Sequence, residues 1–552
     1  MASRRDELNA YSFARKRTNA AFLKPLPNGS IESAPRPLKA VLPSVVMGVV
    51  VTVGFGAWGI FKPVAPQGWD KVGANVLVGD ESTTRYVVLP SKDANGKTQN
   101  LLHPVLNLAS AKLLLDPKKF QVVKVKESEL DGKLAHGPAV GIPYAPDRLP
   151  AANKVDKPKT WAVCNRPGSG ENSQSQQATF VLDGKDTLDI GNTKKGKLDL
   201  HQALYVEDPD GVPWLVDSNG FAFQMIADVT QALKEAKAGL KHADVEDDRT
   251  LRRIIFGSQA QPQKVTAEFM DTLIKSPFPI SMPTVDSAGA KYPFDDVPVE
   301  ARKVGSILQD SNGQKYVVEI NGVAQVSNFV ANLLEQGPNA AAVNHNGKAL
   351  QPFIVATGSI RHPKLDSGNR PFVFAGKILG VDNPWPKETV TAANDFAHGS
   401  QTSGLGSPTP NGVSCSVYKG TATKFPGVEK LGYPNGLPDM GTWVGKDYPA
   451  KIAPGASTYV TPGSGLLYKQ VSNPRSTSGP LFLVTDTGLR YAVPANNDSA
   501  TKAGSDKQEQ DQAQVHLGYG DARPPYMLEA WSKLLSAGPT LDTTSAKQPQ
   551  TS

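Results

Sequence analysis

Residues 40–61 read AVLPSVVMGVVVTVGFGAWGIF, a run of 22 residues without a charged side chain. At 1.5 Å per residue, a helix of this length is about 33 Å long, whereas the hydrocarbon core of a bilayer is about 30 Å thick. A cleaved signal peptide begins nearer the N-terminus and has a shorter apolar core. The run therefore predicts one transmembrane helix, and the rest of the chain divides around it.

The charges that precede this run predict its orientation. Basic residues outnumber acidic ones over residues 1–39, with Arg4, Arg5, Arg15, Lys16, Arg17, Lys24, Arg36 and Lys39 against Asp6, Glu7 and Glu32. Because positive segments stay in the cytoplasm, we expect a cytoplasmic N-terminus and an exterior domain after Lys62. Elsewhere Lys and Arg alternate with Asp and Glu, so the net charge of +7 indicates no nucleic-acid partner.

Small side chains recur every four residues within the predicted span, at Ser44, Gly48, Thr52 and Gly56. They would form one face that lets another helix approach closely, so they are candidate transmembrane packing residues. The GFGAWG sequence at 54–59 matches a dinucleotide-binding pattern, but that pattern binds nucleotides only between a strand and a helix.

The cytoplasmic segment has apolar residues at three- and four-residue spacings, which predicts an amphipathic helix. The candidate docking residues are Leu8, Tyr11, Arg15 and Phe22. Prolines 25, 27, 35 and 37 then end regular structure and form a tether. Two interpretations remain open, a helix that lies on anionic lipid headgroups and a dock for a cytoplasmic partner.

The exterior sequence is duplicated. The 50 glycines and 45 prolines favour short strands and turns. RYVV at 85–88, NG at 95–96 and VLNLASA at 105–111 find an echo in KYVV at 315–318, NG at 321–322 and VSNFVAN at 326–332. Each series predicts a strand, a turn, a second strand and a short helix, which we call the first kind of unit.

A second kind of unit begins with WLVDSNG at 214–220 and recurs as FLVTDTG at 482–488. Both predict a strand that runs into a turn, and both close with a helical pattern before a proline, at 269–274 and 528–535. The units alternate in two halves, 78–283 and 305–541.

These boundaries divide the whole chain. We expect a basic segment with its tether at 1–39, the transmembrane helix at 40–61, a linker at 62–77, repeat units at 78–150, 205–283, 305–340 and 461–541, a central body from 151–204 and 341–460, a connector at 284–304 and a disordered tail at 542–552.

The two cysteines, Cys164 and Cys415, occupy corresponding places between the paired units. Thiols oxidise outside the membrane, so one disulfide is the simplest interpretation. Two buried free thiols are the alternative. Closing a loop of about 250 residues would lower the conformational entropy of the unfolded chain and so stabilise the fold by up to about 5 kcal/mol.

No catalytic, metal or cofactor residue is predicted. GNTKKGKL at 191–198 resembles a phosphate loop but has leucine where a magnesium-binding hydroxyl is needed, so a solvated basic turn is the better interpretation. The eight histidines are scattered singly, without metal-ligand spacing. His103, between apolar residues, is expected to be structural.

The order of these segments, with LHPVLNLASA at 102–111, PGSG at 462–465 and LVTDTGLRY at 483–491, resembles the EccB family. These proteins are core membrane components of the type VII (ESX) secretion machinery of the bacterial inner membrane. The resemblance implies a mainly β fold with short helices (α+β). It also implies an elongated exterior domain of four repeat units, in two pseudo-twofold halves around a central β-barrel-like body with a Cys164–Cys415 disulfide.

The resemblance also implies partners and three hypotheses of function. The partners are an EccC-type motor ATPase, EccD, EccE, the mycosin protease, membrane lipid and further copies through the exterior domain. The leading hypothesis is a structural scaffold of the secretion complex. The alternatives are an ATP-hydrolysing subunit, since an ATPase activity has been ascribed to the family, and a peptidoglycan-binding anchor.

The small-residue face generates a first prediction. Gly48→Leu or Gly56→Leu should lower the yield of assembled complex more than Val49→Leu does, because a bulky side chain on that face pushes a neighbouring helix away. Complex recovered after detergent extraction measures the effect. Equal yields from the three variants would mean that the face contacts lipid.

Overall fold

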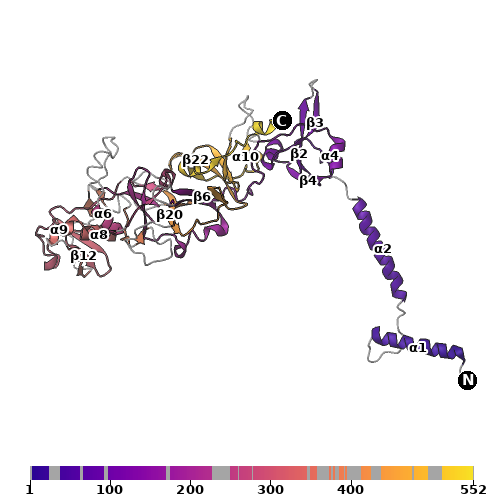
Figure 1. Ribbon diagram of the computed structural model, residues 1–552, viewed down its shortest axis with the longest axis horizontal. Helices are drawn as coiled ribbons and strands as arrows, with labels where there is room; N and C mark the ends of the chain where they lie inside the picture. The colour runs from indigo at the N-terminus through magenta and orange to yellow at the C-terminus, as the bar shows by residue number, and fades with distance from the viewer. Residues whose placement is uncertain are drawn as a thin grey trace. The chain divides into compact units, whose positions relative to one another are not determined.

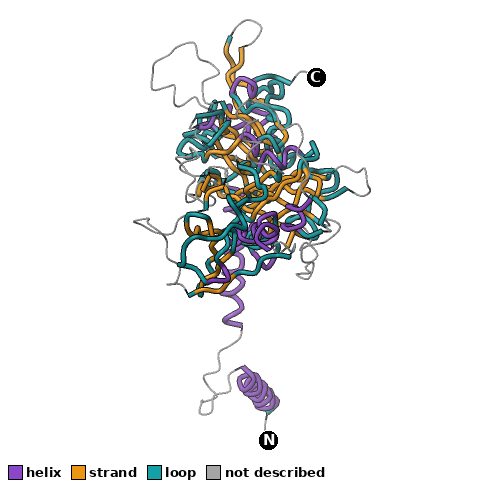
Figure 2. The backbone as a smooth tube through the Cα atoms, turned by 90° about the vertical axis from the view of Figure 1, so that its left-hand side faces the viewer, coloured by secondary structure: helices purple, strands orange, loops and turns teal. Residues whose placement is uncertain are grey.

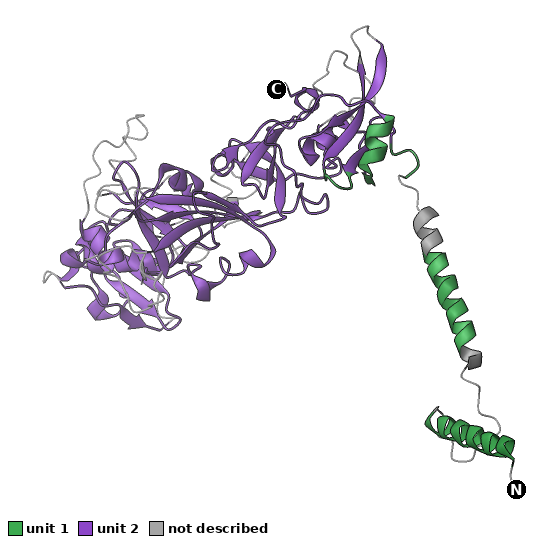
Figure 3. Cartoon of the chain, turned by 45° about the vertical axis from the view of Figure 1, so that its right-hand side comes forward, with its two compact units in different colours: residues 1–69, 79–83, 123–133 green, residues 70–78, 84–122, 134–552 purple. Residues whose placement is uncertain are grey.

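The computed structural model of this chain describes residues 3–23, 38–61, 66–92, 97–168, 175–226, 249–258, 260–276, 278–344, 348–356, 372–374, 377–378, 385–390, 392–393, 412–423, 437–474, 476, 478–494 and 513–550. The fold is mainly β with short helices (Figures 1 and 2). Two compact units divide it, one of residues 1–69, 79–83 and 123–133 and one of the remainder (Figure 3).

The first compact unit contains the two long helices of the chain's N-terminal part. They are α1 (Arg4–Leu23) and α2 (Leu38–Phe61). In α1 the docking candidates Leu8, Tyr11, Arg15 and Phe22 are all exposed. The apolar residues of α1 are not confined to one side, because Phe13 lies about 140° around the helix from Leu8. Within the described residues, no helix is both long and apolar enough to cross a membrane.

Two sheets contain the echoed motifs of the first kind. Three antiparallel strands, β1 (Asn75–Gly79), β2 (Arg85–Lys92) and β3 (Thr98–Pro104), precede α3 (Leu108–Leu114). The same plan appears in β12 (Ile307–Asp310), β13 (Lys315–Glu319), β14 (Gly322–Val326) and α8 (Asn328–Gln336). Even the register agrees, since Leu77 opposes Tyr86 and Leu308 opposes Tyr316. The predicted strands and helix are present, although the Asn95-Gly96 turn lies outside the described residues.

The motifs of the second kind lie in two five-stranded paths with the same order. The first is β10-β7-β8-β9-β11, from β7 (Gln202–Glu207), β8 (Pro213–Asp217), β9 (Phe221–Gln224), β10 (Gln263–Lys264) and β11 (Ile274–Lys275). The second is β25-β22-β23-β24-β26, from β22 (Gly465–Val471), β23 (Leu481–Thr485), β24 (Leu489–Val493), β25 (Tyr526–Leu528) and β26 (Ser536–Ala537). In both, the outermost strands run parallel to their neighbours.

A helix joins the two outermost strands of each of these sheets, α7 (Ala267–Thr272) in one and α11 (Glu529–Ser532) in the other. Both helices end earlier than the helical patterns at 269–274 and 528–535 predict, because the chain then enters β11 or approaches β26. Tertiary strand pairing overrides the local periodicity at these places.

Both faces of each second-kind sheet are buried. On β7, Leu204 and Val206 face a core shared with the central sheet, whereas Tyr205 faces a core shared with β12 to β14 and α8. On β22, Leu466 faces the same central core, and Leu467 packs with α3. Because side chains alternate along a strand, one sheet therefore links two neighbouring cores.

The central sheet is open, so the prediction of a β-barrel-like body is wrong. It consists of β5 (Thr160–Arg166), β6 (Gln176–Leu182), β19 (Val413–Thr423), β20 (Leu437–Gly445) and β21 (Thr458–Val460) in the order β20-β19-β5-β6-β21. Over the described residues, the pairings end at β20 and β21 without meeting. Five strands are fewer than the roughly eight that enclose a side-chain-filled barrel interior.

The remaining elements are short. They are β4 (Gln121–Val125), α4 (Glu127–Lys133), η2 (Gly184–Thr187), η3 (Thr193–Lys195), α6 (Arg249–Phe256), η4 (Val299–Ala301), α9 (Pro338–Asn344), β15 (Phe353–Val355), β16 (Val373–Phe374), β17 (Lys377–Ile378), β18 (Ala392–Ala393), α10 (Ala513–His516) and α12 (Thr543–Lys547).

The tail is folded through residue 550, which corrects the prediction of disorder at 542–552. Asp542 caps α12 by accepting a hydrogen bond from the backbone N–H of Ser545, and Ala546 is fully buried. The backbone N–H of Gln550 donates to the carbonyl of Ala139. Capping and long-range pairing thus order a segment whose composition alone indicated a loose end.

Asp217, the last residue of β8, has a carboxylate whose pKa is shifted in opposite directions by burial and by hydrogen bonding. Burial raises the pKa of Asp217 to about 6, although its Oδ1 accepts backbone N–H bonds from Asn219 and Phe221, each at 2.9 Å, which act in the opposite direction. The ordinary value is 3.8. Folding therefore favours the protonated form, and the folded state loses stability as the pH rises from about 4 through about 6.

Asp217→Asn should remove this loss, because the amide keeps an acceptor oxygen without the charge. We expect the variant of the full chain in detergent to gain on the order of 2 kcal/mol at pH 7.5, seen as a rise of a few degrees in the unfolding temperature. At pH 4 the gain should be nearly absent. The same gain at both pH values would contradict the assignment.

Candidate functional site: the joint between the two halves

The two halves of the chain meet in the central sheet. β5 from the first half pairs antiparallel with β19 from the second, and Cys164 lies directly opposite Cys415. A disulfide joins them across 251 residues, and both side chains are fully buried. The predicted disulfide is therefore present, and the intervening segments of both halves share one sheet.

A polar seam connects the halves beside this sheet. The Nζ atom of Lys159, whose side chain is only 3% exposed, lies 2.5 Å from Oδ2 of Asp183 in the first half. That carboxylate also accepts from Oγ of Ser464 at 3.1 Å, in the second half. Burial alone would raise the pKa of Asp183, but the bonds from Lys159 and Ser464 outweigh it and hold the pKa below its usual value.

Beyond Asp183, the seam continues through a second carboxylate. Asp186 accepts from the hydroxyls of Tyr459, at 2.9 Å, and Thr461, at 2.8 Å. The Thr461 hydroxyl itself accepts the backbone N–H of Asp183. These charge-assisted bonds fix the strand β21 against β6, with which it runs parallel.

An apolar core lies on the other face of the central sheet. Trp161 and Tyr418 are cross-strand partners on β5 and β19. The Trp161 ring meets Tyr468 edge-on at 6.0 Å, and Tyr418 lies 5.8 Å from Trp531 of α11. Strands of both halves and both connecting helices therefore contribute to one core.

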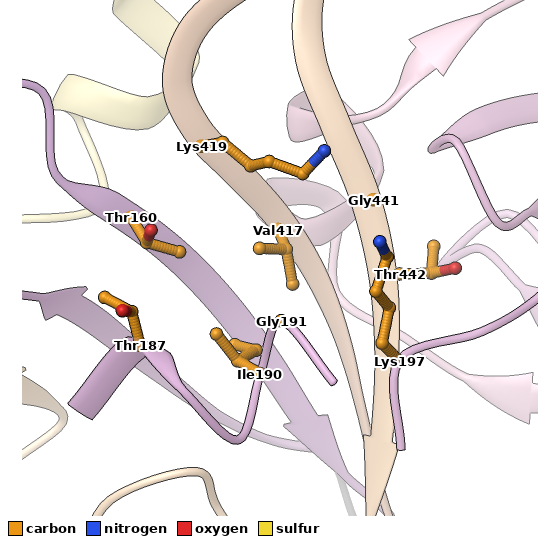
Figure 4. Close-up of a pocket in the computed structure, with 9 residues that line it drawn as sticks. All are labelled: Thr160, Thr187, Ile190, Gly191, Lys197, Val417, Lys419, Gly441 and Thr442. Carbon is orange, nitrogen blue, oxygen red and sulfur yellow. The ribbon is translucent and has the colours of Figure 1, made fainter. Parts of the chain in front are cut away.

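A cavity of about 170 Å³ (Figure 4) is lined in part by Ile190 and Val417, which belong to the same buried cluster as the two cysteines. The first half contributes Ile190, Gly191 and Lys197 to its lining, and the second half contributes Val417 and Lys419, among others. This space is smaller than the roughly 300–1,000 Å³ of typical ligand clefts, so it is too small for a nucleotide.

The phosphate-loop candidate at 191–198 forms one wall of the cavity but has no phosphate cradle. Its backbone N–H groups are used within the turn, since those of Lys195 and Lys197 both donate to the carbonyl of Asn192. The N–H of Lys194 donates to the Asn192 side chain. A phosphate loop needs these groups free to bind phosphate oxygens.

The same segment is held against β20 by backbone packing. Gly196 has a φ of 109°, and a Cβ there would lie 1.9 Å from the carbonyl oxygen of Val444. The indole N–H of Trp443 donates to the carbonyl of Lys195. The segment is thus a turn whose Gly196 and Leu198 end packs against β20.

Other candidate residues have local partners. Ser44 and Thr52 of α2 donate their hydroxyls to carbonyls of Val41 and Gly48 in the same helix. Gly48 has open space around it, and the surroundings of Gly56 lie outside the described residues.

His103 is buried, with Nδ1 at 2.8 Å from the carbonyl oxygen of Pro138. This hydrogen bond inside the fold is what a structural histidine would make. Among the described residues, no three His, Cys, Asp or Glu side chains could hold a metal ion.

Comparison with known proteins identifies the family. A family model described as "Type VII secretion system ESX-1, transport TM domain B" matches residues 1–551. The chain belongs to this EccB family. The "ESX-3 secretion system ATPase EccB3" of Mycobacterium tuberculosis is 26% identical over 534 residues, covering 92% of this chain and 83% of the relative. The "ESX-1 secretion system ATPase EccB1" of Mycolicibacterium smegmatis is 26% identical over 330 residues, which cover 59% of each chain.

Chains in solved structures are also similar. A chain of an intact ESX-5 inner membrane complex matches with a TM-score of 0.50 and 20% identity, covering 100% of this chain and 96% of that one. A chain of an EccB3 dimer from an ESX-3 core complex matches with a TM-score of 0.49 and 20% identity, covering 86% of this chain. At such identities the likeness concerns the fold.

The disulfide generates a stability prediction. Cys164→Ser should lower the unfolding temperature of the full chain in detergent, because the unfolded state regains the freedom of a long loop, worth up to about 5 kcal/mol. Cys415→Ser and the double variant should give nearly the same shift, since either change breaks the same bond.

Non-reducing peptide mapping of protein from the cell envelope provides the direct measurement. A linked peptide pair containing both cysteines is expected. Two free thiols that react with an alkylating reagent, or a double variant markedly less stable than either single one, would show that the halves are not covalently joined.

Proposed function

We propose that this EccB-family chain is a structural membrane component of the type VII (ESX) secretion machinery, which scaffolds and stabilises the inner-membrane complex and its exterior side during export. The observation that carries the proposal is the family match over residues 1–551. A stable joint between the halves suits a scaffold, because the disulfide, the polar seam and a shared core all resist their separation.

The proposal includes a membrane arrangement. Residues 40–61 would cross the inner membrane once, with residues 1–39 in the cytoplasm and the rest outside. The 22 uncharged residues, the basic segment before them and the family description, which names a transport TM domain, support this arrangement. Ser44, Gly48, Thr52 and Gly56 would then contact a neighbouring helix, and the exposed residues of α1 would dock on lipid or a partner.

The exterior part would be an elongated domain of four repeat units in two pseudo-twofold halves. The second-kind sheets share one five-stranded order, apart from the added pairing of β18 with β7, and the first-kind sheets have matched registers; both observations support this division. The partners would be an EccC-type motor ATPase, EccD, EccE, the mycosin protease and further copies of the chain. Similar chains occur in an ESX-5 inner membrane complex and an EccB3 dimer.

ATP hydrolysis is the competing function, because the names of the relatives include the word ATPase. In the phosphate-loop candidate, the backbone N–H groups of Lys194, Lys195 and Lys197 all donate to Asn192, and the segment borders a cavity too small for a nucleotide. A peptidoglycan-binding role has no comparable observation in its favour. Sedimentation with purified peptidoglycan would test it.

Affinity purification of the tagged full chain from detergent-solubilised inner membrane tests the scaffold. Mass spectrometry should identify a large motor ATPase and a multi-span membrane protein in the purified complex. A chain that is recovered alone under conditions that keep other membrane complexes intact would contradict the proposal.

A second measurement separates scaffold from enzyme. The purified chain, free of the motor, should show no ATP turnover that depends on Lys197. Lys197→Ala is compared with Lys195→Ala, whose ammonium group pairs with Asp189 at 2.7 Å outside the cavity lining. A loss of turnover specific to Lys197→Ala would establish the hydrolase.

A further inference from the structure

Two glycines, Gly191 and Gly441, are among the residues that line the cavity on the central sheet. Gly441 of β20 stands opposite Val417 of β19, so the strand pair has a side chain at only one of the two positions. Gly191 in the facing turn likewise contributes no side chain. Ile190 and Val417, both buried, supply apolar walls to the space that remains (Figure 4).

Two ammonium groups border this apolar space, and their partners differ. Lys419 lies 2.7 Å from a carboxylate oxygen of Asp439, which balances its charge. Lys197 is half-buried and has no carboxylate partner among the described residues. Figure 4 shows the side chains of both lysines at the cavity, with the Thr160 side chain on another wall. Within the part of the chain that the structure describes, one of the two lining ammonium groups thus has no carboxylate partner.

Size and polarity restrict what could bind there. A cavity of about 150 Å³ accommodates a benzene molecule, so one of about 170 Å³ suits a body of roughly six to eight non-hydrogen atoms. A phosphate or sulfate would leave the Ile190 and Val417 walls against charged oxygens. A neutral hydrocarbon would offer the Lys197 ammonium no hydrogen-bond acceptor.

We propose that this cavity binds a small monocarboxylate with a short branched aliphatic body, with its carboxylate at Lys197 and its apolar part between Ile190 and Val417. A free fatty acid of this size and the carboxyl end of a peptide share this chemistry. The site is distinct from the scaffold role proposed above and does not depend on it.

Occupancy would strengthen the joint between the halves. Lys197 and Ile190 belong to the first half, and Val417 belongs to the second, so one ligand contacts both. A ligand that binds only the folded, joined state stabilises that state in proportion to the logarithm of its concentration over Kd. The cavity would therefore make the stability of the joint responsive to a small molecule.

Titration of the full chain in detergent with isovalerate, followed by saturation-transfer NMR of the ligand, tests the proposal. Isovaleramide is the matched neutral probe, because it has the same shape without the charge. We expect saturable binding of isovalerate and about tenfold weaker binding of the amide, the loss typical of a charge-assisted bond. An acetylated dipeptide ending in valine, titrated in parallel, distinguishes a peptide terminus from a free acid.

Variants locate the binding in this cavity. Lys197→Met should weaken isovalerate binding about tenfold, and Lys197→Arg should largely restore it. Lys195→Met, which removes an ammonium paired with Asp189, should leave the affinity unchanged. Equal affinities for acid and amide, no saturable binding of isovalerate, or an equal effect of the Lys195 variant would each overturn the proposal.

Discussion

The pairing of β5 with β19 is the constraint on which the rest of the exterior fold depends. It brings together strands about 250 residues apart and fixes both faces of the central sheet at once. Ala162 and Cys164 lie on the disulfide face, while Trp161 and Val163 lie on the face toward α7 and α11. A slip of one residue would exchange these sets and separate the cysteines, so the two cores and the disulfide specify the same register.

From this sheet, packing extends outward through the second-kind sheets. Each has apolar residues on both faces, which explains why WLV at 214–216 and FLV at 482–484 are continuous apolar runs instead of alternating ones. One face contributes to the core around Trp161, and the other holds a first-kind unit. The second-kind sheets thereby connect the central sheet to α3 and α8, whose core residues, within the described part of the chain, belong to clusters without residues of β5 or β19.

Much of this arrangement could be predicted from the sequence, and the exceptions have physical reasons. The disulfide could be predicted because three properties agree at Cys164 and Cys415. The predicted compartment is oxidising, the chain has two cysteines, and they occupy corresponding places in a duplicated sequence. The strands β1 and β12 were not predicted because the repeated motifs, which begin at residues 85 and 315, start one strand later. Two-residue strands such as β10 and β11 are too short to show an alternating pattern in the sequence. Whether the central sheet closes into a barrel depends on its number of strands, which local patterns do not reveal.

The candidate cavity was still less accessible to sequence reasoning. GNTKKGKL at 191–198 drew attention to Lys197 for a chemistry that its backbone does not support. Lys197 lines a cavity together with Val417 and Gly441, which lie more than 200 residues away in the sequence. No local motif connects them to the lysine. Gly441, which lines the cavity, is one of 50 glycines.

The position of the disulfide also divides the chain mechanically. Residues 165–414 form a covalently closed loop that contains β7 to β9 and β12 to β14, whereas β1 to β3 and β22 to β24 lie outside it. Tension applied between the two chain ends would pass from Cys164 to Cys415 through the sulfur atoms and bypass the loop. The elements outside the loop would bear a pulling force, and those inside it would remain unloaded for as long as the bond is intact.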